Sequence, residues 1–350
     1  MLCGVINGTT TLNNAILKLM KDTDIKITKA GTVVLLATGG TIAGIGKDGK
    51  STGYRAGQLS AEEILEKVPG LEHLAPVVPI QICNINSDDI TSDIWIETVH
   101  LINSLAANPL VSSFVILHGT DTMEETAYFL NLTLKTEKPV IITGSMRPAT
   151  SMSADSYLNI YESVLVATSP EAVGKGVLIV FSDQIFTARS MTKASTYSVK
   201  AISGGESGSI GIIRDDEVFF YGKSIKKHTI YTEFDVSDIT TLPRVSIVYF
   251  ATDQNPAMIK YAASISDGLV IAGAGAGEFS KLFAEEIKKT TIPVVISSRV
   301  NDGIITQGNL LCKETVAANN LQPQKAAILL RLALTKTTDY NELFRIFSTY

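Results

Sequence analysis

The chain alternates short apolar runs with longer segments in which apolar residues recur at helical spacing. The apolar runs are rich in β-branched residues and end in glycine, serine, threonine or aspartate, a pattern typical of buried parallel strands followed by turns. We expect strands at residues 32–37, 77–85, 114–117, 139–143 and 176–181. Helices are expected at residues 61–68, with Ser60 as cap, and at 93–105. Another is expected after the turn that follows the third strand, and one more at 153–167 with Ser153 as cap. This alternation predicts a mainly parallel sheet covered on both faces by helices.

The alternation pauses after this region and then resumes. Residues 209–234 contain glycines and short β-like pieces, which predict hairpins that lead into a linker at residues 222–243. Further strands are expected at residues 245–250, 269–272 and 293–297, and helices at 256–264, 279–289, 322–334 and 339–347. The predicted fold class is therefore α/β with two domains: a larger N-terminal domain at 31–221 and a smaller C-terminal parallel-sheet domain at 244–350. Residues 1–30 are expected to be an N-terminal extension without a motif.

Composition narrows the class of protein. The 350 residues, 45% hydrophobic and 19% charged, suit two globular domains. The net charge of −5 does not fit a protein that binds nucleic acid through a basic surface. No apolar run reaches the roughly 18 residues of a membrane span, and the N-terminus lacks the features of a secretory signal. The 3 cysteines are far apart in the sequence and odd in number, which suits reduced thiols in a cytosolic protein. The 4 histidines are scattered and show no metal-binding spacing. We expect a cytoplasmic protein without a metal, a cofactor, or a nucleic-acid or membrane partner.

Polar residues follow four of the predicted strands. They are Thr41, Ser87 with Asp88, Thr120 with Asp121, and Ser145. Serine and aspartate at strand ends mostly make caps and turns. Because the carboxyl ends of parallel strands share one edge, where α/β sheets bind ligands, four such clusters predict one shared crevice.

The contents of this crevice suggest acyl transfer on a small zwitterion. A threonine hydroxyl needs a base, and Tyr54, on a glycine-rich segment, and Lys193 are the candidates. Ionised Asp88 and Asp121 could hold an α-ammonium group. The turn after the strand at residues 114–117 also has a plainer interpretation, because Thr122 and Glu125 have the spacing of a capping box. We expect Thr122 to cap the helix, while Thr120 and Asp121 face the crevice.

Two glycine-rich segments suggest other ligands. Residues 38–44 follow a strand and could cradle a phosphate, but they lack the spacing of a P-loop. Gly273, Gly275 and Gly277 resemble a dinucleotide loop without its third glycine at the proper offset. Binding of a nicotinamide cofactor, and with it an oxidoreductase, is therefore an alternative hypothesis. No GxSxG motif supports an α/β-hydrolase serine.

Five runs of sequence resemble the bacterial-type L-asparaginases, especially their type II branch. They are LATGGTIAG at 36–44, HGTDTMEETAYFL at 118–130, GSMRPATSMSAD at 144–155, SSRV at 297–300 and QPQKA at 322–326. The resemblance extends from about residue 32 to residue 350 in the same order. It implies a larger N-terminal and a smaller C-terminal α/β domain, and a homotetramer built from intimate dimers with each active site at the dimer interface.

The resemblance also implies roles for individual residues. Thr41 matches the nucleophile, which forms an aspartyl ester, and Tyr54 matches the loop tyrosine that assists proton transfer. Thr120, Asp121 and Lys193 match a triad-like relay. The matching substrate-binding positions are Gly40, Ser87, Asp88, Gly119 and Ser145, with Ser87 and Asp121 gripping the α-carboxylate and α-ammonium groups. Asparagine is the implied substrate, and glutamine a weaker one.

Two departures from the family pattern open an alternative. Asp88 stands where the family has Gln or Glu, so its side chain is one methylene shorter and is charged. Residues 306–313 lack the glutamate that the family supplies across the dimer interface, and Glu278 could replace this carboxylate. The alternative hypothesis is a catalytically impaired relative that binds an amino acid.

Overall fold

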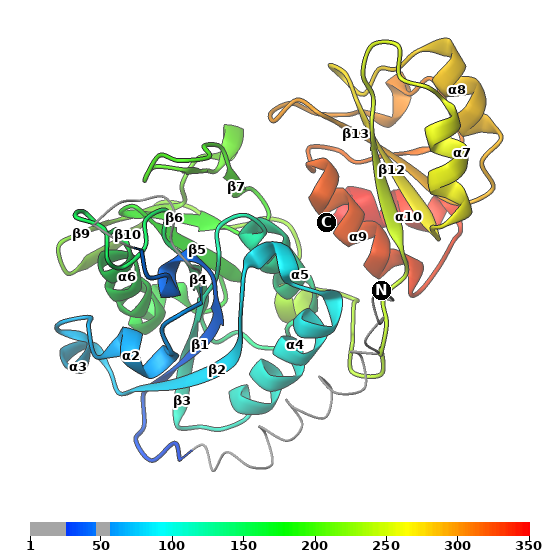
Figure 1. The fold of residues 1–350 in the computed structure, drawn as a ribbon. Helices are drawn as coiled ribbons and strands as arrows, with labels where there is room; N and C mark the ends of the chain where they lie inside the picture. The colour runs from blue at the N-terminus through cyan, green and yellow to red at the C-terminus, as the bar shows by residue number, and fades with distance from the viewer. Residues whose placement is uncertain (1–25, 47–56) are drawn as a thin grey trace, which may run out of the picture.

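The computed structural model describes residues 26–46 and 57–350, which fold around an eight-stranded and a four-stranded sheet (Figure 1). The larger sheet has the strand order β10-β9-β6-β5-β4-β3-β1-β2. Its strands are β1 (Thr32–Gly39), β2 (Val77–Ile85), β3 (Val111–Leu117), β4 (Val140–Thr143), β5 (Val177–Phe181), β6 (Gln184–Thr187), β9 (Gly211–Arg214) and β10 (Glu217–Phe220). The neighbours from β2 to β5 run parallel, whereas β6, β9 and β10 add an antiparallel edge.

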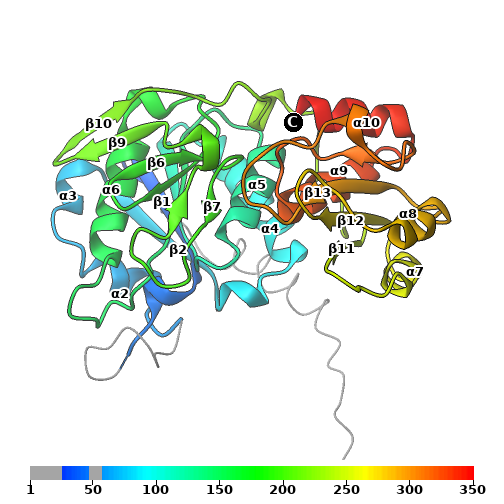
Figure 2. The ribbon, with the colours of Figure 1, turned by 90° about the horizontal axis from the view of Figure 1, so that it is seen from above.

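Helices cover both faces of this sheet, as predicted. α4 (Ser92–Ala106) and α5 (Met123–Thr133) pack on one face, where the rings of Trp95 and Phe129 stack with centroids 5.1 Å apart. α6 (Ser156–Thr168) covers the other face with the short helices α2 (Ala61–Leu65) and α3 (Leu71–Leu74) (Figure 2). Successive residues of β1 enter opposite cores, Val34 on the α5 side and Leu35 on the α6 side. The continuous apolar run of β1 thus reflects burial on both faces.

The antiparallel edge contains one strand that the pattern does not predict. β6 follows β5 through a two-residue turn, Ser182 and Asp183, whose φ angles are 50° and 62°. Such turns need positive φ and are usually marked by glycine, which is absent here. The hairpin predicted within residues 209–234 is confirmed by the pairing of β9 with β10.

The second sheet is entirely parallel, in the order β11-β12-β13-β14. Its elements are β11 (Val245–Tyr249), α7 (Ala257–Ser264), β12 (Gly268–Gly273), α8 (Lys281–Lys288), β13 (Val294–Ser298), β14 (Val316–Ala317), α9 (Pro323–Leu334) and α10 (Tyr340–Thr349). One face packs on α7 and α8 in its own core, with Phe283 fully buried. The other face packs on α9, and Leu329 of α9 shares a buried cluster with Val270 of β12 and Phe129 of α5. A single hydrophobic core therefore joins the two sheets.

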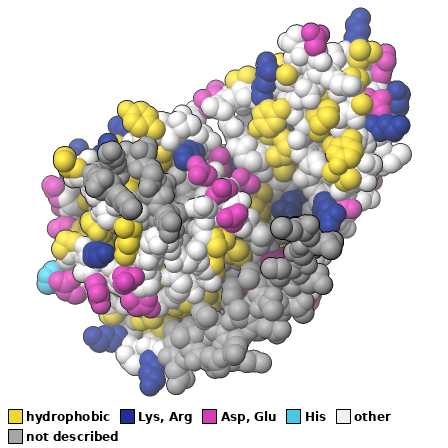
Figure 3. All heavy atoms as spheres, in the orientation of Figure 1, with side chains coloured by type: hydrophobic (Ala, Val, Ile, Leu, Met, Phe, Trp, Pro, Cys, Tyr) yellow, Lys and Arg dark blue, Asp and Glu magenta, His cyan; other side chains and the backbone are white. Residues whose placement is uncertain are grey.

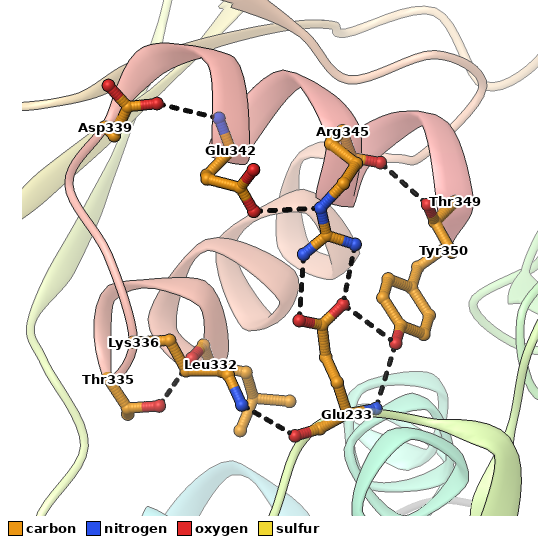
Figure 4. Close-up of polar contacts among 9 residues, drawn as sticks. All are labelled: Glu233, Leu332, Thr335, Lys336, Asp339, Glu342, Arg345, Thr349 and Tyr350. Carbon is orange, nitrogen blue, oxygen red and sulfur yellow. Dashed lines mark hydrogen bonds and ion pairs between the residues drawn. The ribbon is translucent and has the colours of Figure 1, made fainter.

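The segment between the sheets is also fixed to the C-terminal helix. The guanidinium of Arg345 donates two hydrogen bonds, of 2.9 and 2.8 Å, to the carboxylate of Glu233 (Figure 4). The backbone N–H of Glu233 donates to the hydroxyl of Tyr350 at 3.0 Å, and Lys336 Nζ donates to the carbonyl of Glu233 at 2.9 Å. Because these bonds use both the side chain and the backbone of Glu233, this connection has a defined path.

The two predicted serine caps differ in outcome. Ser60 caps α2 as expected, since its hydroxyl accepts the N–H of Glu63 at 3.2 Å and the Glu63 carboxylate accepts the N–H of Ser60 at 2.8 Å. The Ser153 cap is wrong, because α6 starts three residues later with Asp155 at the N-cap position. No helix among residues 26–46 and 57–350 has the length and hydropathy to span a membrane.

Candidate active site

The turns after β1, β2 and β3 meet at one edge of the larger sheet. A Cβ atom on Gly40, where φ is 80°, would lie 2.5 Å from the Cα and N atoms of Gly119. A Cβ atom on Gly119 would lie 2.8 Å from Oγ of Ser87. A side chain on Gly40 would overlap the Gly119 backbone, and one on Gly119 would overlap the side chain of Ser87, so the lack of a side chain at both positions allows this close approach. The predicted convergence of strand ends is thus a feature of the structure.

The turn after β4 joins the same place. A Cβ atom on Gly144 would lie 2.4 Å from the carbonyl oxygen of His118 and 3.1 Å from Cγ2 of Thr120. Ser145 is fully buried, and its hydroxyl donates to the carbonyl of Arg147 at 2.8 Å. The Ser145 side chain is therefore used within its own turn, which leaves its backbone for the crevice.

Lys193 lies between Thr120 and Asp121. Its Nζ donates to Oγ1 of Thr120 at 2.9 Å and to Oδ1 of Asp121 at 2.6 Å. Lys193 ends β7 (Thr192–Lys193), which pairs with β8 (Ile202–Ser203) in a two-stranded ribbon outside the main sheet. Its side chain is 15% exposed, whereas that of Asp121 is 69% exposed. The three side chains form a connected group, with the carboxylate open to solvent.

The hydroxyl of Thr120 is oriented by its neighbours. Thr120 is buried, accepts a hydrogen bond from Lys193, and donates its own proton to the thioether sulfur of Met146 at 3.5 Å. A thioether is a weak acceptor. A stronger acceptor in the crevice would therefore compete readily for this proton.

A buried histidine supports the turn from behind. His118 Nδ1 lies 2.7 Å from the carbonyl oxygen of Gly119, and Nε2 lies 2.9 Å from the hydroxyl of Thr126. The Thr126 hydroxyl also accepts the indole N–H of Trp95 at 2.8 Å. Burial lowers the pKa of His118 to about 4, so the ring is neutral near pH 7. These bonds assign the proton to Nδ1, which donates to Gly119, while Nε2 accepts from Thr126.

Thr122 behaves differently from the prediction. It occupies the N-cap position of α5, but its side chain makes no capping hydrogen bond. Its hydroxyl instead donates to the carbonyl of Ser87 at 2.7 Å. The capping role is therefore wrong, because a tertiary bond between the turns after β2 and β3 takes the hydroxyl.

The remaining predicted residues lie in several places. Thr41 is half-buried and starts the 3-10 helix η1 (Thr41–Ala43) directly after Gly40. Ser87 is buried and Asp88 exposed in η2 (Ser87–Asp89). Glu278 is exposed in the connection between β12 and α8, on the smaller sheet. Tyr54 lies outside the described residues.

Two supporting residues were not among the predicted site residues. His118 is part of the HGTDT run, but no second residue at a known metal-binding or catalytic spacing marks it as functional in the sequence. Asp155 accepts the backbone N–H groups of Met146, at 2.9 Å, and Arg147, at 3.0 Å, and so holds the turn after β4. Its position at the start of a helix suggests only a cap, so the sequence carried no separate signal for this bond.

Metal ligands and free thiols also bear on the chemistry. Within the described ranges, no group of three or more histidine, cysteine, aspartate or glutamate side chains is placed to hold a metal ion. Cys83 and Cys312 are both free thiols. A cavity of about 1100 Å³ lies away from the crevice, lined by residues that include Arg244, Asp267 and Arg331. Cavity size therefore does not identify the site, whereas the joined strand ends do.

Comparisons with known proteins agree over both sheets. A family model described as "Asparaginase, N-terminal" matches residues 32–226, and "Glutaminase/Asparaginase C-terminal domain" matches residues 244–347. The chain is 42% identical over 324 residues to L-asparaginase 2 of Bacillus subtilis (strain 168), covering 90% of this chain and 86% of that protein. It is 38% identical over 325 residues to the probable periplasmic L-asparaginase of Haemophilus influenzae, covering 91% and 93%. The crystal structure of a probable cytoplasmic L-asparaginase from Campylobacter jejuni has a TM-score of 0.87 and 39% identity, covering 91% of this chain and 100% of that chain.

Proposed function

Because the chain belongs to the asparaginase family, we propose that it hydrolyses L-asparagine to L-aspartate and ammonia, with L-glutamine as a weaker substrate. The proteins from Bacillus and Haemophilus are both named as L-asparaginases, and the C-terminal family description includes glutaminase. The observation that carries the proposal is the bonded group of Lys193, Thr120 and Asp121 at the joined strand ends.

Thr41 is the proposed nucleophile. Its Oγ attacks the side-chain amide carbon, the C–N bond breaks, and ammonia leaves after its nitrogen takes up a proton. Water then hydrolyses the aspartyl ester and releases aspartate. The position supports this role, because Thr41 follows Gly40, whose backbone is held against Gly119 in the turn that carries Thr120. Tyr54 is the proposed partner that accepts the Thr41 proton.

Thr120 and Lys193 are the proposed proton relay. An ammonium group beside a hydroxyl favours the negative charge that the oxygen gains when it gives up a proton. Thr120 can thus supply a proton to the leaving nitrogen and recover one from the water that attacks the ester. Backbone N–H groups near Thr120 would stabilise the oxyanion, an effect of about 3 kcal/mol per donor.

The substrate's backbone groups are proposed to bind at the open side of the crevice. The exposed carboxylate of Asp121 suits an α-ammonium group, and buried Ser87 suits the α-carboxylate. Gly40, Gly119 and Ser145 would contribute backbone groups around the amide. Asp88 and Glu278 are further proposed carboxylates, with Glu278 acting from the neighbouring subunit.

The activity is tested by measuring ammonia release by the purified full chain from L-asparagine, L-glutamine and their D-enantiomers. We expect release from L-asparagine and slower release from L-glutamine. Absence of ammonia with all four substrates would contradict the proposal. Binding of aspartate in a calorimeter without any turnover would instead favour the alternative hypothesis, a catalytically impaired relative that binds an amino acid. The shorter side chain of Asp88 is one reason for this alternative.

We also propose a homotetramer built from intimate dimers. Large apolar side chains on and near α7 stay 47–63% exposed, and Figure 3 shows hydrophobic side chains gathered over this part of the molecule. They are Tyr249, Met258, Tyr261 and Ile265. Light scattering of the protein as it elutes from a size-exclusion column should give four times the mass of one chain. A fully active monomer would contradict this proposal.

The proposed compartment is the cytoplasm. The similar structure from Campylobacter jejuni is that of a probable cytoplasmic L-asparaginase, and the free thiols Cys83 and Cys312 suit a reducing compartment. The Haemophilus influenzae relative is named periplasmic, so fractionation of the native cell is the test. Recovery of the activity in the periplasmic fraction would contradict the cytoplasmic assignment.

A further inference from the structure

The first turn of α9 carries a lysine whose ammonium group is buried in the other domain. Lys325 is 1% exposed. Its Nζ donates to the carbonyl oxygens of Ala188 and Arg189, both at 3.0 Å, and to that of Met191. A lysine ammonium has three N–H donors, so all of them are used on one short segment.

This segment leads directly to Lys193. It connects the end of β6 at Thr187 with β7, and Met191 precedes Lys193 by two residues. Ala188 and Met191 are fully buried. Buried carbonyl groups without partners cost free energy, so the ammonium of Lys325 determines which path this segment follows.

The preceding residue of α9 contacts the other half of the catalytic group. Gln324 Nε2 donates to Oε1 of Glu124 at 2.9 Å. Glu124 is buried in the first turn of α5, three residues after Asp121. The Lys325 ammonium also lies 6.0 Å from the ring centroid of Tyr128, on the same helix. Two neighbouring residues of α9 thus contact the two segments that supply Lys193, Thr120 and Asp121.

The charge state of Lys325 suits this arrangement. Burial lowers the pKa of Lys325 to about 8, while the nearby carboxylate of Glu124 favours the charged form. The ammonium form, with three donors, therefore prevails near pH 7.

We propose that Lys325 is a positioning residue for the reaction, which, together with Gln324, fixes the segment bearing Lys193 against the turn bearing Thr120 and Asp121. The proposal rests on the proposed hydrolase function. Its physical reason is that the bonds of 2.9 and 2.6 Å made by Lys193 join segments from different elements. A misplacement of about 1 Å at such a contact can cost on the order of 100-fold in rate.

The test compares Lys325→Met with Lys336→Met as a matched control. Lys336 lies just beyond the other end of α9 and also donates to a backbone carbonyl, that of Glu233 at 2.9 Å, but it does not touch the segment before Lys193. We expect Lys325→Met to lower kcat by about 10- to 100-fold with KM within about twofold. The reason is that Lys325 binds the segment before Lys193, whereas Ser87 and Asp121, the proposed ligands of the substrate's backbone groups, lie on other turns. Lys336→Met should keep the wild-type kcat.

A crystal structure of Lys325→Met supplies a readout that does not depend on activity. The Lys193 Nζ to Thr120 Oγ1 distance should increase beyond hydrogen-bonding range. A folded Lys325→Met variant with wild-type kcat and an unchanged distance would overturn the proposal. If wild-type protein and Lys336→Met release no ammonia either, the proposed function fails, and the distance alone decides the positioning role.

A milder variant covers the case in which Lys325→Met does not fold. Gln324→Leu removes the bond to Glu124 and leaves the Lys325 ammonium in place. It should lower kcat by a few-fold with unchanged KM and a melting temperature close to that of the wild type. A folded Gln324→Leu variant with wild-type kcat would then overturn the proposal.

Discussion

The two hydrogen bonds of Lys193 are the most specific contacts in the crevice. They select one rotamer of a long side chain and point it at a hydroxyl and a carboxylate on the same turn. Strand-end reasoning predicts Thr120 and Asp121, because their turn directly follows a strand, whereas Lys193 is predicted as a candidate base and from the family resemblance. Lys325 is not predicted, because the carbonyls that it binds lie 134 to 137 positions away in the chain.

Replacement of Lys193 should affect turnover far more than stability. Lys193→Met removes the charge beside Thr120, and we expect kcat to fall by about 10²- to 10⁴-fold, the usual range for proton-transfer groups. The melting temperature should change little, since the lysine lies at the edge of a short ribbon. Lys200→Met, at a nearby exposed position, is the control and should match the wild type. Unfolding of Lys193→Met, or its full activity, would identify the residue as a structural ion-pair partner instead.

His118 should make the protein sensitive to acid. Its pKa is about 4 in the folded protein because of burial, against 6.5 in an unfolded chain, so the unfolded state binds the additional proton as the pH falls. The free energy of unfolding should therefore decrease between about pH 6.5 and pH 4, by about 3 kcal/mol in total for this group.

The matched variants isolate this effect from that of other titrating groups. His118→Gln should remove this part of the pH dependence in urea unfolding, whereas His73→Gln, at a side chain that is 82% exposed, should retain it. The difference between variant and wild type is the relevant quantity, because raised carboxyl pKa values, such as that of Glu162, act in the opposite direction. Parallel pH profiles for wild type and His118→Gln would contradict the assignment.

The turns at the strand ends can pack closely because glycine, which has no side chain, occupies positions such as Gly40 and Gly119. Gly40→Ala would place a methyl group 2.5 Å from the Gly119 backbone, at a φ of 80°. We expect a loss of about 2 to 4 kcal/mol in the free energy of unfolding together with most of the activity, because strain and overlap add. Gly31→Ala, at a φ of 77° with nothing within 4 Å, isolates the backbone strain and should cost about 1 to 2 kcal/mol without loss of activity. Equal effects of the two substitutions would contradict the close approach.

Secondary structure followed from sequence where local signals were strong. Apolar runs rich in β-branched residues predict the inner strands β1, β3, β4, β5, β12 and β13, because these strands are buried on both faces. The edge strands β2 and β11 are also predicted, although most of their residues are only partly buried. β6 was missed because its turn, Ser182-Asp183, reaches positive φ without glycine. The predicted caps at Thr122 and Ser153 are wrong because a cap pattern reports only local chemistry. The Thr122 hydroxyl donates to the carbonyl of Ser87, and the Ser153 hydroxyl accepts a hydrogen bond from the guanidinium of Arg147.

The core shared by α5 and α9 should make the two parts of the molecule unfold together. The chain has 1 tryptophan, Trp95, which reports on the larger sheet. Leu329→Ala, on α9, should lower the free energy of unfolding by about 2 to 5 kcal/mol and shift the Trp95 fluorescence transition as much as the circular-dichroism transition. Leu282→Ala, at a side chain 62% exposed on α8, should shift neither. A Trp95 transition unaffected by Leu329→Ala would show that the domains unfold independently.

The most direct test of the proposed chemistry compares ammonia release from L-asparagine by the wild-type chain and by the Thr120→Val variant. This substitution removes the hydroxyl at nearly constant volume. We expect turnover by the wild type and a rate reduced by at least about 10²-fold in Thr120→Val, with aspartate binding retained. Absence of turnover in the wild type, or an equal rate in the variant, would contradict a hydrolase in which Lys193 and Thr120 move the proton.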